Sequence, residues 1–422
     1  MAAPTDNAAA NTALITNDAV VLGLLAVILA LVFWTSSRDK GGWAKFYAYV
    51  PALLLCYFIP ALFNSVGIID GSASKLYPVA RDYLLPTSLV LLCLAIDLGA
   101  ILRLGPKAII MFLTGTAGVM LGALVSFMVM GVIHPETVAG DTWRGMTTVA
   151  GSWIGGGANQ AAMKEVFDVN DNLFGQFVAV DVLVANLWMA ILLFMAGRAQ
   201  AFDRWTHADT SAIRDMQVRI EAYHAQHARI PTLTDLMVIL GVGLGATGLA
   251  HFLTDPLVAW IKTLPQEWKL SDYSLTSGFF WIVVFATTFG LILSFTRARK
   301  LEGVGASRIG SAMLYILVAT IGMQMDLSAL LDRPWLFVLG LIWISVHAIL
   351  LLVVAKLIRA PLFFLAVGSQ ANIGGAASAP VVASAFHPSL APVGVLLAVL
   401  GYALGTYCAY ITGLMLRALA GG

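Results

Sequence analysis

The sequence predicts an all-α polytopic membrane protein made of two inverted repeats, and three observations lead to this fold class. Hydrophobic residues make up 59% of the 422 residues and charged residues only 11%, whereas about a quarter of the residues in soluble proteins are charged. The apolar residues gather in runs of a length that crosses a bilayer as a helix. Two kinds of motif recur in the same order in both halves of the chain.

Composition also excludes several classes of function. The 24 basic and 23 acidic side chains leave a net charge of +1, so we expect no nucleic acid as a partner. Cys56, Cys93 and Cys408 lie within apolar runs and have neither disulfide nor zinc spacing. The sequence contains no nucleophile elbow, phosphate loop or zinc-protease helix. We therefore expect no enzyme, no metal site and no cofactor.

Twelve apolar segments follow one another along the chain, with one long polar stretch between the sixth and the seventh. The segments are 18–34, 46–64, 79–97, 107–132, 144–167, 174–196, 234–254, 276–296, 308–326, 335–358, 361–386 and 391–417. The first segment follows a tail without Lys or Arg, so we interpret it as a retained helix and not as a secretory signal.

This order divides the chain into four parts: an extracytoplasmic N-terminal tail (1–17), a first membrane repeat (18–196), a cytoplasmic polar linker (197–232) and a second membrane repeat (233–422). Within the linker, the pattern over 213–227 predicts a short amphipathic helix on the membrane surface.

The third segment of each half ends on a matching motif. The first half has Asp97 followed by Leu-Gly-Ala, the second has Asp326 followed by Leu-Ser-Ala, and a proline opens the next helix in both. A glycine-rich break follows later in each half, with GSWIGGGANQAA from Gly151 and GSQANIGGAASA from Gly368. Two matches in one order indicate an internal duplication.

Basic residues indicate how the glycine-rich segments lie in the membrane, because basic loops tend to stay in the cytoplasm. Five basic clusters occur, around Arg38, Arg103, the 197–232 linker, Arg299 and Lys356. No orientation places all five inside if every segment crosses. If the two glycine-rich segments are re-entrant, ten crossings remain, the amino terminus lies outside and all five clusters become cytoplasmic. Each half then has five crossings, so the second half is inverted. An unrecognised extra crossing would restore the parity equally well. The exception to this topology is Arg417, which falls near the outer end of the last helix.

The glycine-rich breaks supply the candidate binding site. Non-helical backbone at membrane depth must be buried in protein or line a cavity, and paired broken helices that meet at the midplane are typical of a transporter's binding site. These apolar stretches also hold more amide and hydroxyl side chains than helix packing requires. The candidate substrate-binding residues are Ser152, Gly155, Gly156, Gly157, Asn159, Gln160, Ser369, Gln370, Asn372, Gly374 and Gly375.

Acidic side chains within the segments are candidates for binding a coupling ion. Asp181 lies in the helix after the first break, where a charge costs on the order of 2.5–3.5 kcal/mol to insert. We interpret it as the site of a sodium ion or a proton, with Asn186 supplying a carbonyl oxygen; a protonated acid bonded to a neighbouring helix is the structural alternative. Asp97 and Asp326 are weaker candidates for an ion pathway, because helix capping explains them equally well. For His347 a structural role is favoured over a proton relay.

The two glycine-rich breaks and the duplicated Asp-Leu helix ends resemble the membrane family known as domain of unknown function 819, over about 18–417. That family is grouped with the superfamily of cation/proton antiporters and bile-acid/sodium symporters. The resemblance implies an inverted-repeat fold with a panel domain, a core domain and two discontinuous helices that cross near the midplane, and it suggests a homodimer. It also matches Asp181 to the membrane-embedded acid after the first discontinuous helix. Antiporters of the superfamily carry two adjacent acids or Asn-Asp there, whereas this chain has Val180 and Asp181. The breaks also resemble the glycine-pair loops of citrate and glutamate symporters, which are hairpins and do not cross.

These observations favour a secondary active transporter that moves a small polar or anionic organic solute, coupled to sodium or protons, by alternating access around a midplane site. The expected partners are the solute, Na⁺ or H⁺ as coupling ion, and the lipid bilayer. The expected location is the bacterial inner membrane. A sodium/proton antiporter without an organic substrate is the first alternative. A passive channel or a non-transporting membrane scaffold is the alternative of another class.

Overall fold

The structure is a computed structural model that describes residues 13–38, 40–47, 50, 52–102, 104–210, 213, 231–265, 268, 270, 275–325, 333–387 and 390–421. Asp326, its Asp-Leu helix end, most of the 213–227 segment and residues 1–12 of the N-terminal tail were singled out above and lie outside the described residues. Within the described residues the chain is helical throughout, and its extended pairing is limited to a bridge between Ile15 and Ile69.

The first half of the chain contains the helices α1 (Asp18–Ser36), α2 (Gly42–Tyr47), α3 (Ala52–Ser65), α4 (Leu76–Val79), the π-helical turn η1 (Ala80–Leu84), α5 (Leu85–Leu94), α6 (Leu98–Leu102), α7 (Pro106–Ile133), α8 (Pro135–Val138), α9 (Thr142–Gly155), α10 (Gly157–Val166) and α11 (Asp171–Ala196). The second half contains α12 (Ala199–Thr206), α14 (Leu233–Ile261), α15 (Gly278–Ser294), the 3₁₀-helix η4 (Arg297–Val304), α16 (Ala306–Gly322), α17 (Trp335–Leu357), α18 (Leu362–Ile373), α19 (Gly375–Ser384) and α20 (Ala391–Leu419).

Six of the described helices are long and apolar enough to cross a membrane: α1, α7, α11, α14, α17 and α20. A seventh is added if α15 and η4, which are bent by 94° at their junction, count as one span. Three shorter apolar helices lie over Leu54–Ser65, Ala306–Gly322 and Leu362–Ile373. By length and composition the described chain therefore offers six or seven spans, fewer than the ten crossings that the sequence predicts.

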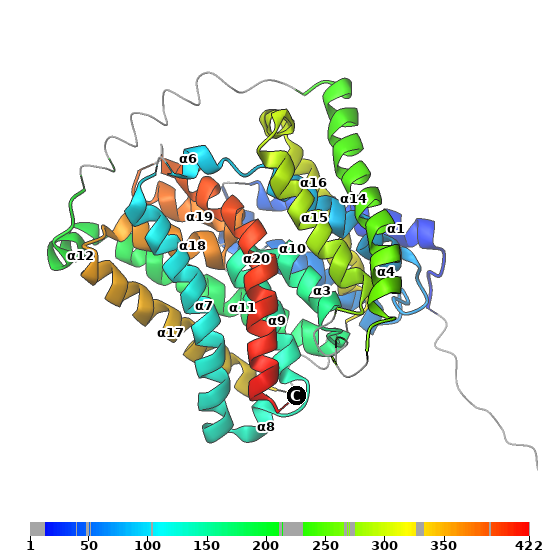
Figure 1. Cartoon of the computed structure of the whole chain (residues 1–422), viewed down its shortest axis with the longest axis horizontal. Helices are drawn as coiled ribbons and strands as arrows, with labels where there is room; N and C mark the ends of the chain where they lie inside the picture. Colours follow the sequence, from blue (N-terminus) through cyan, green and yellow to red (C-terminus); the bar gives the residue numbers. More distant parts are fainter. Residues whose placement is uncertain are drawn as a thin grey trace, which may run out of the picture.

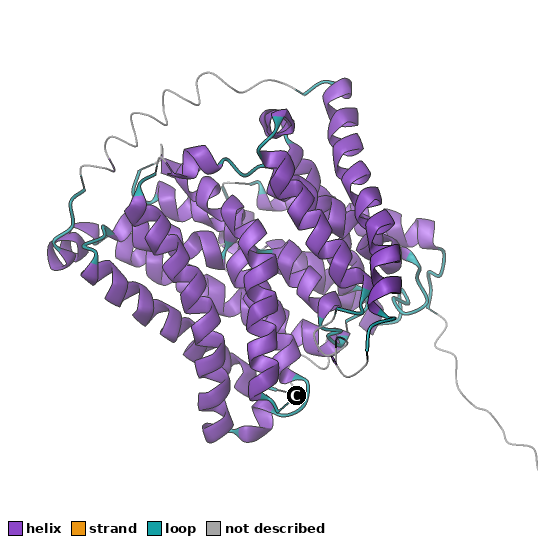
Figure 2. Ribbon diagram, viewed as in Figure 1, coloured by secondary structure: helices purple, strands orange, loops and turns teal. Residues whose placement is uncertain are grey.

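The helices form two bundles. Bundle one consists of α1, α3, α4, α5, α14, α15 and α16, and bundle two consists of α7, α9, α10, α11 and α17 to α20. In Figure 1, α14, α15 and α16 lie towards one side of the molecule and α7 and α17 towards the other, with α20 between the two sets. Figure 2 shows the same arrangement as packed helices joined by short loops. The bundles meet where α10 and α20 contact α5 and α15.

A proline explains the irregular helix that runs from α4 through η1 to α5. Pro86 has no N–H, so the carbonyl of Asp82, four residues earlier, loses its helical donor. The imidazole Nε2 of His251 on α14 lies 2.9 Å from this carbonyl and donates to it. His251 thus satisfies a main-chain group at the π-helical turn and ties α14 to its neighbour.

Candidate functional site

The first glycine-rich segment is a helical hairpin, which we call hairpin one (α9 and α10). Gly156 separates its arms with φ of +77°, a backbone conformation in the region that glycine favours. A straight helix would place residues 144 and 167 roughly 35 Å apart. Instead Arg144 Nη1 donates to the carbonyl of Phe167 at 2.6 Å. Both ends of this segment therefore lie on the same side of the molecule, as re-entrance requires.

The second glycine-rich segment folds back in the same manner and forms hairpin two (α18 and α19). Its break is at Gly374 and Gly375, and Gly375 has φ of +57°. Phe363 at the start of α18 and Phe386 beyond α19 have ring centroids 5.4 Å apart. This segment also returns to the side from which it came.

The tips of the two hairpins touch. A Cβ atom on Gly375 would lie 4.0 Å from the Cα of Gly156. Helix α20 passes close to the same place, because a Cβ on Gly405 would lie only 2.6 Å from the Cα of Gly155. The junction gathers two helix C-termini, from α9 and α18, and two N-termini, from α10 and α19. Such ends carry partial charges of opposite sign that can hold ions or polar groups.

Asp181 on α11 joins the two arms of hairpin one. Its carboxylate is 4% exposed and accepts three hydrogen bonds. Ser152 Oγ donates at 2.6 Å and Trp153 Nε1 at 2.7 Å from α9, and Gln160 Nε2 donates at 2.9 Å from α10. All three donors are neutral, and none of the ion pairs that the structure describes includes Asp181. A buried carboxylate without a positive partner is costly unless a proton or a cation neutralises it.

A neutral hydrogen-bonded chain fixes hairpin two in the same way. His347 on α17 has its Nδ1 3.1 Å from the carbonyl of Gly115, which can only accept, so Nδ1 carries the proton. Ser369 therefore donates to Nε2 over 2.8 Å, and it accepts from Trp188 Nε1 at 2.8 Å. Trp188 lies two turns beyond Asp181 on the same face of α11. Helix α11 thus contacts both hairpins through one face.

Asn159 and Asn372 have all their hydrogen-bonding groups occupied. The side-chain amide nitrogen of each asparagine donates to the backbone carbonyl four residues earlier, at 2.9 Å in both hairpins. Each also donates to a carbonyl of the neighbouring helix, Tyr402 on α20 or Phe112 on α7. Each amide oxygen then accepts from a threonine four residues further along that helix, Thr406 at 2.6 Å or Thr116 at 2.8 Å.

Gln370 differs from these amides. Its Nε2 donates to Ser378 Oγ at 2.7 Å, and its Oε1 is buried without a hydrogen-bond partner among the described contacts. Gln370 lies beside the break, since a Cβ on Gly374 would approach its Nε2 within 2.3 Å. The Tyr57 hydroxyl on α3 of bundle one is also buried and unpartnered in the described structure. Buried polar atoms without partners are rare in proteins and indicate places where a ligand can bind.

The structure does not bring the remaining candidates together with Asp181. Asn186 donates to the carbonyl of Val182 in its own helix at 2.6 Å and is only partly buried. Asp97 lies near the end of α5 and pairs with Arg299 at 3.1 Å. The contact of Asn186 fits a residue on the surface of a helix, and the contact of Asp97 fits a residue that ties a loop to its neighbour.

Several residues of the junction were missed by sequence reasoning. Trp153, Trp188, Thr116 and Thr406 supply hydrogen bonds to the polar side chains of the hairpins. The indole of Trp153 also packs on that of Trp343, with centroids 5.0 Å apart. The available signal was a polar atom within an apolar helix, which occurs too often to single out these positions.

A cavity of about 570 Å³ leads towards the hairpin tips between the bundles. It is lined by α1 and α16 of bundle one and by α20 of bundle two, and it has Glu302 and Arg308 at one end and Tyr402 at the other. The ring of Tyr402 lies 3.8 Å from a Cβ placed on Gly156. Tyr402 therefore separates this cavity from the tip of hairpin one.

A polar cluster closes the base of hairpin one against bundle one. Lys164 is 6% exposed and pairs with Asp171 at 2.9 Å and with Glu165 at 3.2 Å. Tyr77 on α4 donates to Glu165 and accepts from Lys164 Nζ at 2.9 Å. Arg81 on η1 approaches Glu165 within 3.7 Å. At this end the two bundles are tied together by charges.

A family model described as protein of unknown function (DUF819) matches residues 23–419. The chain belongs to the DUF819 family. This confirms the family resemblance read from the glycine-rich motifs. A relative named uncharacterized membrane protein YjcL, from Bacillus subtilis (strain 168), is 24% identical over 404 residues, which cover 93% of this chain and 96% of the relative. The DUF819 match spans both halves and both hairpins, and together with the six long apolar helices it makes this chain an integral membrane protein.

Proposed function

We propose that this DUF819 protein is a secondary active transporter of a small polar or anionic organic solute, coupled to a sodium or proton gradient. The observation that carries the proposal is the contact between two helical hairpins at Gly156 and Gly375, beside a buried carboxylate that has only neutral partners. Paired hairpins of this kind surround solute sites in membrane transporters. A non-catalytic and cofactor-free role follows from the same proposal.

In this proposal Asp181 binds the coupling cation. The three neutral donors orient the carboxylate without neutralising it, so a sodium ion or a proton supplies the missing charge. The Ser152 hydroxyl can reverse its direction and accept when Asp181 is protonated. Because Asp181 joins both arms of hairpin one, loss of the cation changes the forces that hold the tip. The solute contacts the backbone at Gly156 and Gly375 and the unpartnered Oε1 of Gln370.

Contacts between distant segments support a topology of ten crossings with inverted repeats. Each of the following contacts joins two positions that this topology assigns to one face. On the face expected in the cytoplasm these are Asp97 with Arg299, Lys107 with Arg359, and Asp203 with Leu362. On the opposite face they are Asp18 with Ser74, Arg144 with Phe167, and Arg333 with Glu136. Figure 1 has α6 at one edge of the molecule and α8 with the chain's end at the opposite edge.

The two bundles also fit the duplication, since each contains matching parts of both halves. Bundle one takes the first three segments of each half, and bundle two takes the last three. This division parallels the panel and core domains of the cation/proton antiporter and bile-acid/sodium symporter superfamily, in which we place the DUF819 chain. The hairpins differ from the crossing helices usual there. Homodimerisation and a bacterial inner-membrane location belong to the same proposal.

The structure corresponds to one state of an alternating-access cycle under this proposal. The 570 Å³ cavity extends to Tyr402, next to the tip of hairpin one, from the side of Glu302 and Arg308, which the topology assigns to the cytoplasm. The cluster around Lys164 and Glu165 joins the bundles at the other side. Transport then requires the bundles to separate at this cluster and to close around Tyr402.

Reconstitution tests the proposal. Purified protein in sealed vesicles is screened for uptake of radiolabelled carboxylates and amino acids under imposed sodium or proton gradients. We expect saturable accumulation that depends on one of the two gradients and is abolished in Asp181→Asn, which keeps an acceptor oxygen for the neighbouring donors but cannot bind the cation as a charge. Asn186→Ala serves as the matched control on the same helix and should retain coupled uptake.

Other outcomes separate the alternatives. Uptake that never exceeds equilibrium would indicate a passive channel, and pH-dependent sodium efflux without any solute would indicate an antiporter. Unchanged gradient-driven uptake in Asp181→Asn would remove Asp181 from the mechanism.

A further inference from the structure

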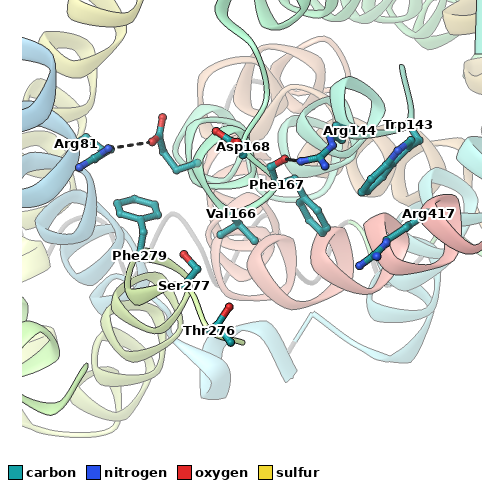
Figure 3. A pocket seen from close by; sticks show the side chains of 11 residues that line it. Arg81, Trp143, Arg144, Val166, Phe167, Asp168, Thr276, Ser277, Phe279 and Arg417 are labelled. Carbon is teal, nitrogen blue, oxygen red and sulfur yellow. Dashed lines mark hydrogen bonds and ion pairs between the residues drawn. The ribbon is translucent and has the colours of Figure 1, made fainter. Parts of the chain in front are cut away.

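A second cavity, of about 510 Å³, lies at the base of hairpin one, well inside the size range of small-ligand sites. Its walls come from both bundles. Arg81, Thr276 and Phe279 line it from bundle one and from the turn before α15, and Arg144 and Arg417 line it from bundle two. Figure 3 shows these side chains arranged around the cavity, on ribbons far apart in the sequence.

The lining side chains of the cavity carry a net charge of +1. They include three arginines and two acids, Glu165 and Asp168; Asp82 and Asp141, which pair with Arg81 and Arg144, are not among them. The topology proposed above assigns all three arginines to the extracytoplasmic face, where basic residues are disfavoured. Arg417 was the exception to that topology in the sequence, and the structure places it with Arg81 and Arg144 at one cavity. A shared ligand would explain this concentration of arginine on the disfavoured face.

Two of the arginines are held in place and still have N–H groups available. Arg81 is paired with Asp82 at 2.8 Å and lies over the ring of Phe279 at 5.8 Å. Its Nη1 is 3.7 Å from Glu165, beyond hydrogen-bonding distance. Arg144 donates through Nη1 to the carbonyl of Phe167 and has its Nε 3.0 Å from Asp141 in an ion pair, without a hydrogen bond among the described contacts. Its Nη2 makes no described hydrogen bond either, and each of the two side chains is about a third exposed, at 36% and 35%.

The remaining lining strengthens the preference for an anion. The 17-residue helix α15 begins beside the cavity, with Ser277 as its N-cap and Thr276 just before it. A helix N-terminus adds partial positive charge. Thr276 makes no hydrogen bond among the described contacts, so its hydroxyl is available as a donor.

We propose that this cavity binds small organic carboxylates, held between Arg81 of bundle one and Arg144 of bundle two. The planar guanidinium group matches a carboxylate in shape and charge. A ligand with two or more carboxylates can contact both walls at once, so di- and tricarboxylates bind most tightly. That this cavity binds anions does not depend on the transport proposal. That solute enters here from outside rests on the proposed transport function, and it would identify the solute as an anion.

Titration calorimetry on the full chain in nanodiscs of phosphatidylcholine tests the site, with citrate and succinate as probes and glycerol as the neutral control, at constant ionic strength. We expect both anions to bind, citrate more tightly, and the affinity to fall as sodium chloride is raised. Arg81→Gln should weaken binding roughly tenfold or more, because it removes a charge-assisted contact. Arg38→Gln is the matched control, since Arg38 also lies over an aromatic ring, the indole of Trp34 at 4.6 Å, but does not line the cavity.

A second pair of variants guards against a change in fold. Thr276→Asp places a negative charge in the cavity without removing a described hydrogen bond, and the Thr276→Asn side chain has nearly the same shape as the aspartate without the charge. Binding should be lost in Thr276→Asp and kept in Thr276→Asn. Equal binding in both variants would overturn the proposal, and so would an absence of citrate binding to the wild type. If phosphatidylglycerol added to the nanodiscs binds and citrate and succinate do not, the site recognises a lipid headgroup and the proposal is overturned.

The same measurements separate this inference from the transport proposal. Citrate binding that is lost in Thr276→Asp, in a protein that transports nothing under any gradient, would support the anion site and contradict the transporter. Gradient-driven uptake that is unaffected by Thr276→Asp would contradict the cavity as the entry site and leave the transporter standing.

Discussion

Asn159 and Asn372 show how single side chains stabilise an interrupted helix inside a membrane. A break leaves carbonyl groups without helical donors, and lipid cannot replace those donors. Each asparagine donates both to a carbonyl of its own arm and to one of a neighbouring helix, while a threonine of that helix occupies its oxygen. The breaks are therefore tied to α20 and α7 by side chains that satisfy every group they bring.

Replacing Asn372 by alanine should destabilise the protein. The change removes the bond to the Phe112 carbonyl and leaves the buried Thr116 hydroxyl with only a long bond of 3.4 Å to that carbonyl, and a buried polar group that loses its partner costs roughly 1–3 kcal/mol. Asn186→Ala is the control, since the described side-chain bond of Asn186 stays within its own helix and the residue is only partly buried. Thermal melts of the purified protein measure the difference, and an equal loss in both variants would contradict the assigned role.

Asp203 gives a pH-dependent test outside the membrane segments. It lies on the surface helix α12 and accepts from the N–H of Leu362 at 2.8 Å, where α18 begins. Burial raises the pKa of its carboxyl above the ordinary value of 3.8, and the bond from Leu362 opposes this shift. Because the folded state binds the proton more tightly, the stability from Asp203 is fully present below pH 3.8 and is lost as pH rises through the raised pKa.

Asp203→Asn keeps an acceptor for the Leu362 N–H and does not ionise. We expect the melting temperature of the wild type to fall relative to that of the variant as the pH rises from below 3.8 to neutral. A constant difference between the two melting curves across this range would show that the carboxyl does not titrate as described.

The sequence predicted which side chains lie at the breaks but not how they are used. Ser152 and Gln160 were expected to contact a solute, and in the structure they donate to Asp181. The partners lie 29 and 21 residues apart, and periodicity within one helix cannot reveal a contact between elements. The structural role favoured for His347 agrees with its two bonds to Gly115 and Ser369.

At the scale of elements, the hairpins depend on a few residues that allow the chain to reverse. Gly156 and Gly375 have positive φ, and each stands where one arm ends and the next begins. Parity of the basic loops favoured the reversal, because re-entrant segments bring all five basic clusters to one side, although an extra crossing would have done the same. The sequence also led us to expect the two breaks to meet, but it could not show that α20 packs against Gly155 at their junction.

Two adjacent glycines at the tip of hairpin one allow a controlled test of this turn. Gly156→Ala forces an L-residue to φ of +77° and ψ of −175°, a conformation almost restricted to glycine that costs about 1–3 kcal/mol. Gly157→Ala is the matched control, because Gly157 opens α10 without positive φ and its Cβ would meet an ordinary contact at 3.8 Å. We expect a lower melting temperature and reduced uptake for the first variant and little change for the second. Indistinguishable variants would show that the turn does not need glycine.

At the scale of the whole molecule, matching segments of the two halves gather in the same bundle. The first three segments of each half form bundle one and the last three form bundle two, with α10 and α20 at the boundary. Helical content and membrane character were predictable from apolar runs alone. The division into bundles was not, because strongly apolar helices can pack in many orders and only the contacts of the folded chain distinguish them.

The cavities lie along the boundary between the bundles. One reaches Tyr402 from the side of Arg308, and the other holds Arg81 and Arg144 at the base of hairpin one. The tie between the bundles around Lys164 lies next to the second cavity. If the bundles move against each other, this boundary is where access to the hairpin tips changes.

The central claim is that both glycine-rich segments enter and leave the membrane on one side, each from the opposite face. Cysteine accessibility tests it in a variant without the native thiols, which occur at Cys56, Cys93 and Cys408. Single cysteines introduced at Asp141 and at Asn172 flank hairpin one. Asn172 is chosen and not the neighbouring Asp171, because the Asp171 carboxylate pairs with Lys164.

A membrane-impermeant maleimide added to intact cells should label cysteines at positions 141 and 172 equally. Cysteines at Arg359, just before hairpin two, and at His387, just after it, should react only after the membrane is opened. Labelling of 141 and 172 from opposite sides, or of 359 and 387 from opposite sides, would mean that the corresponding segment crosses the membrane and would contradict the paired hairpins.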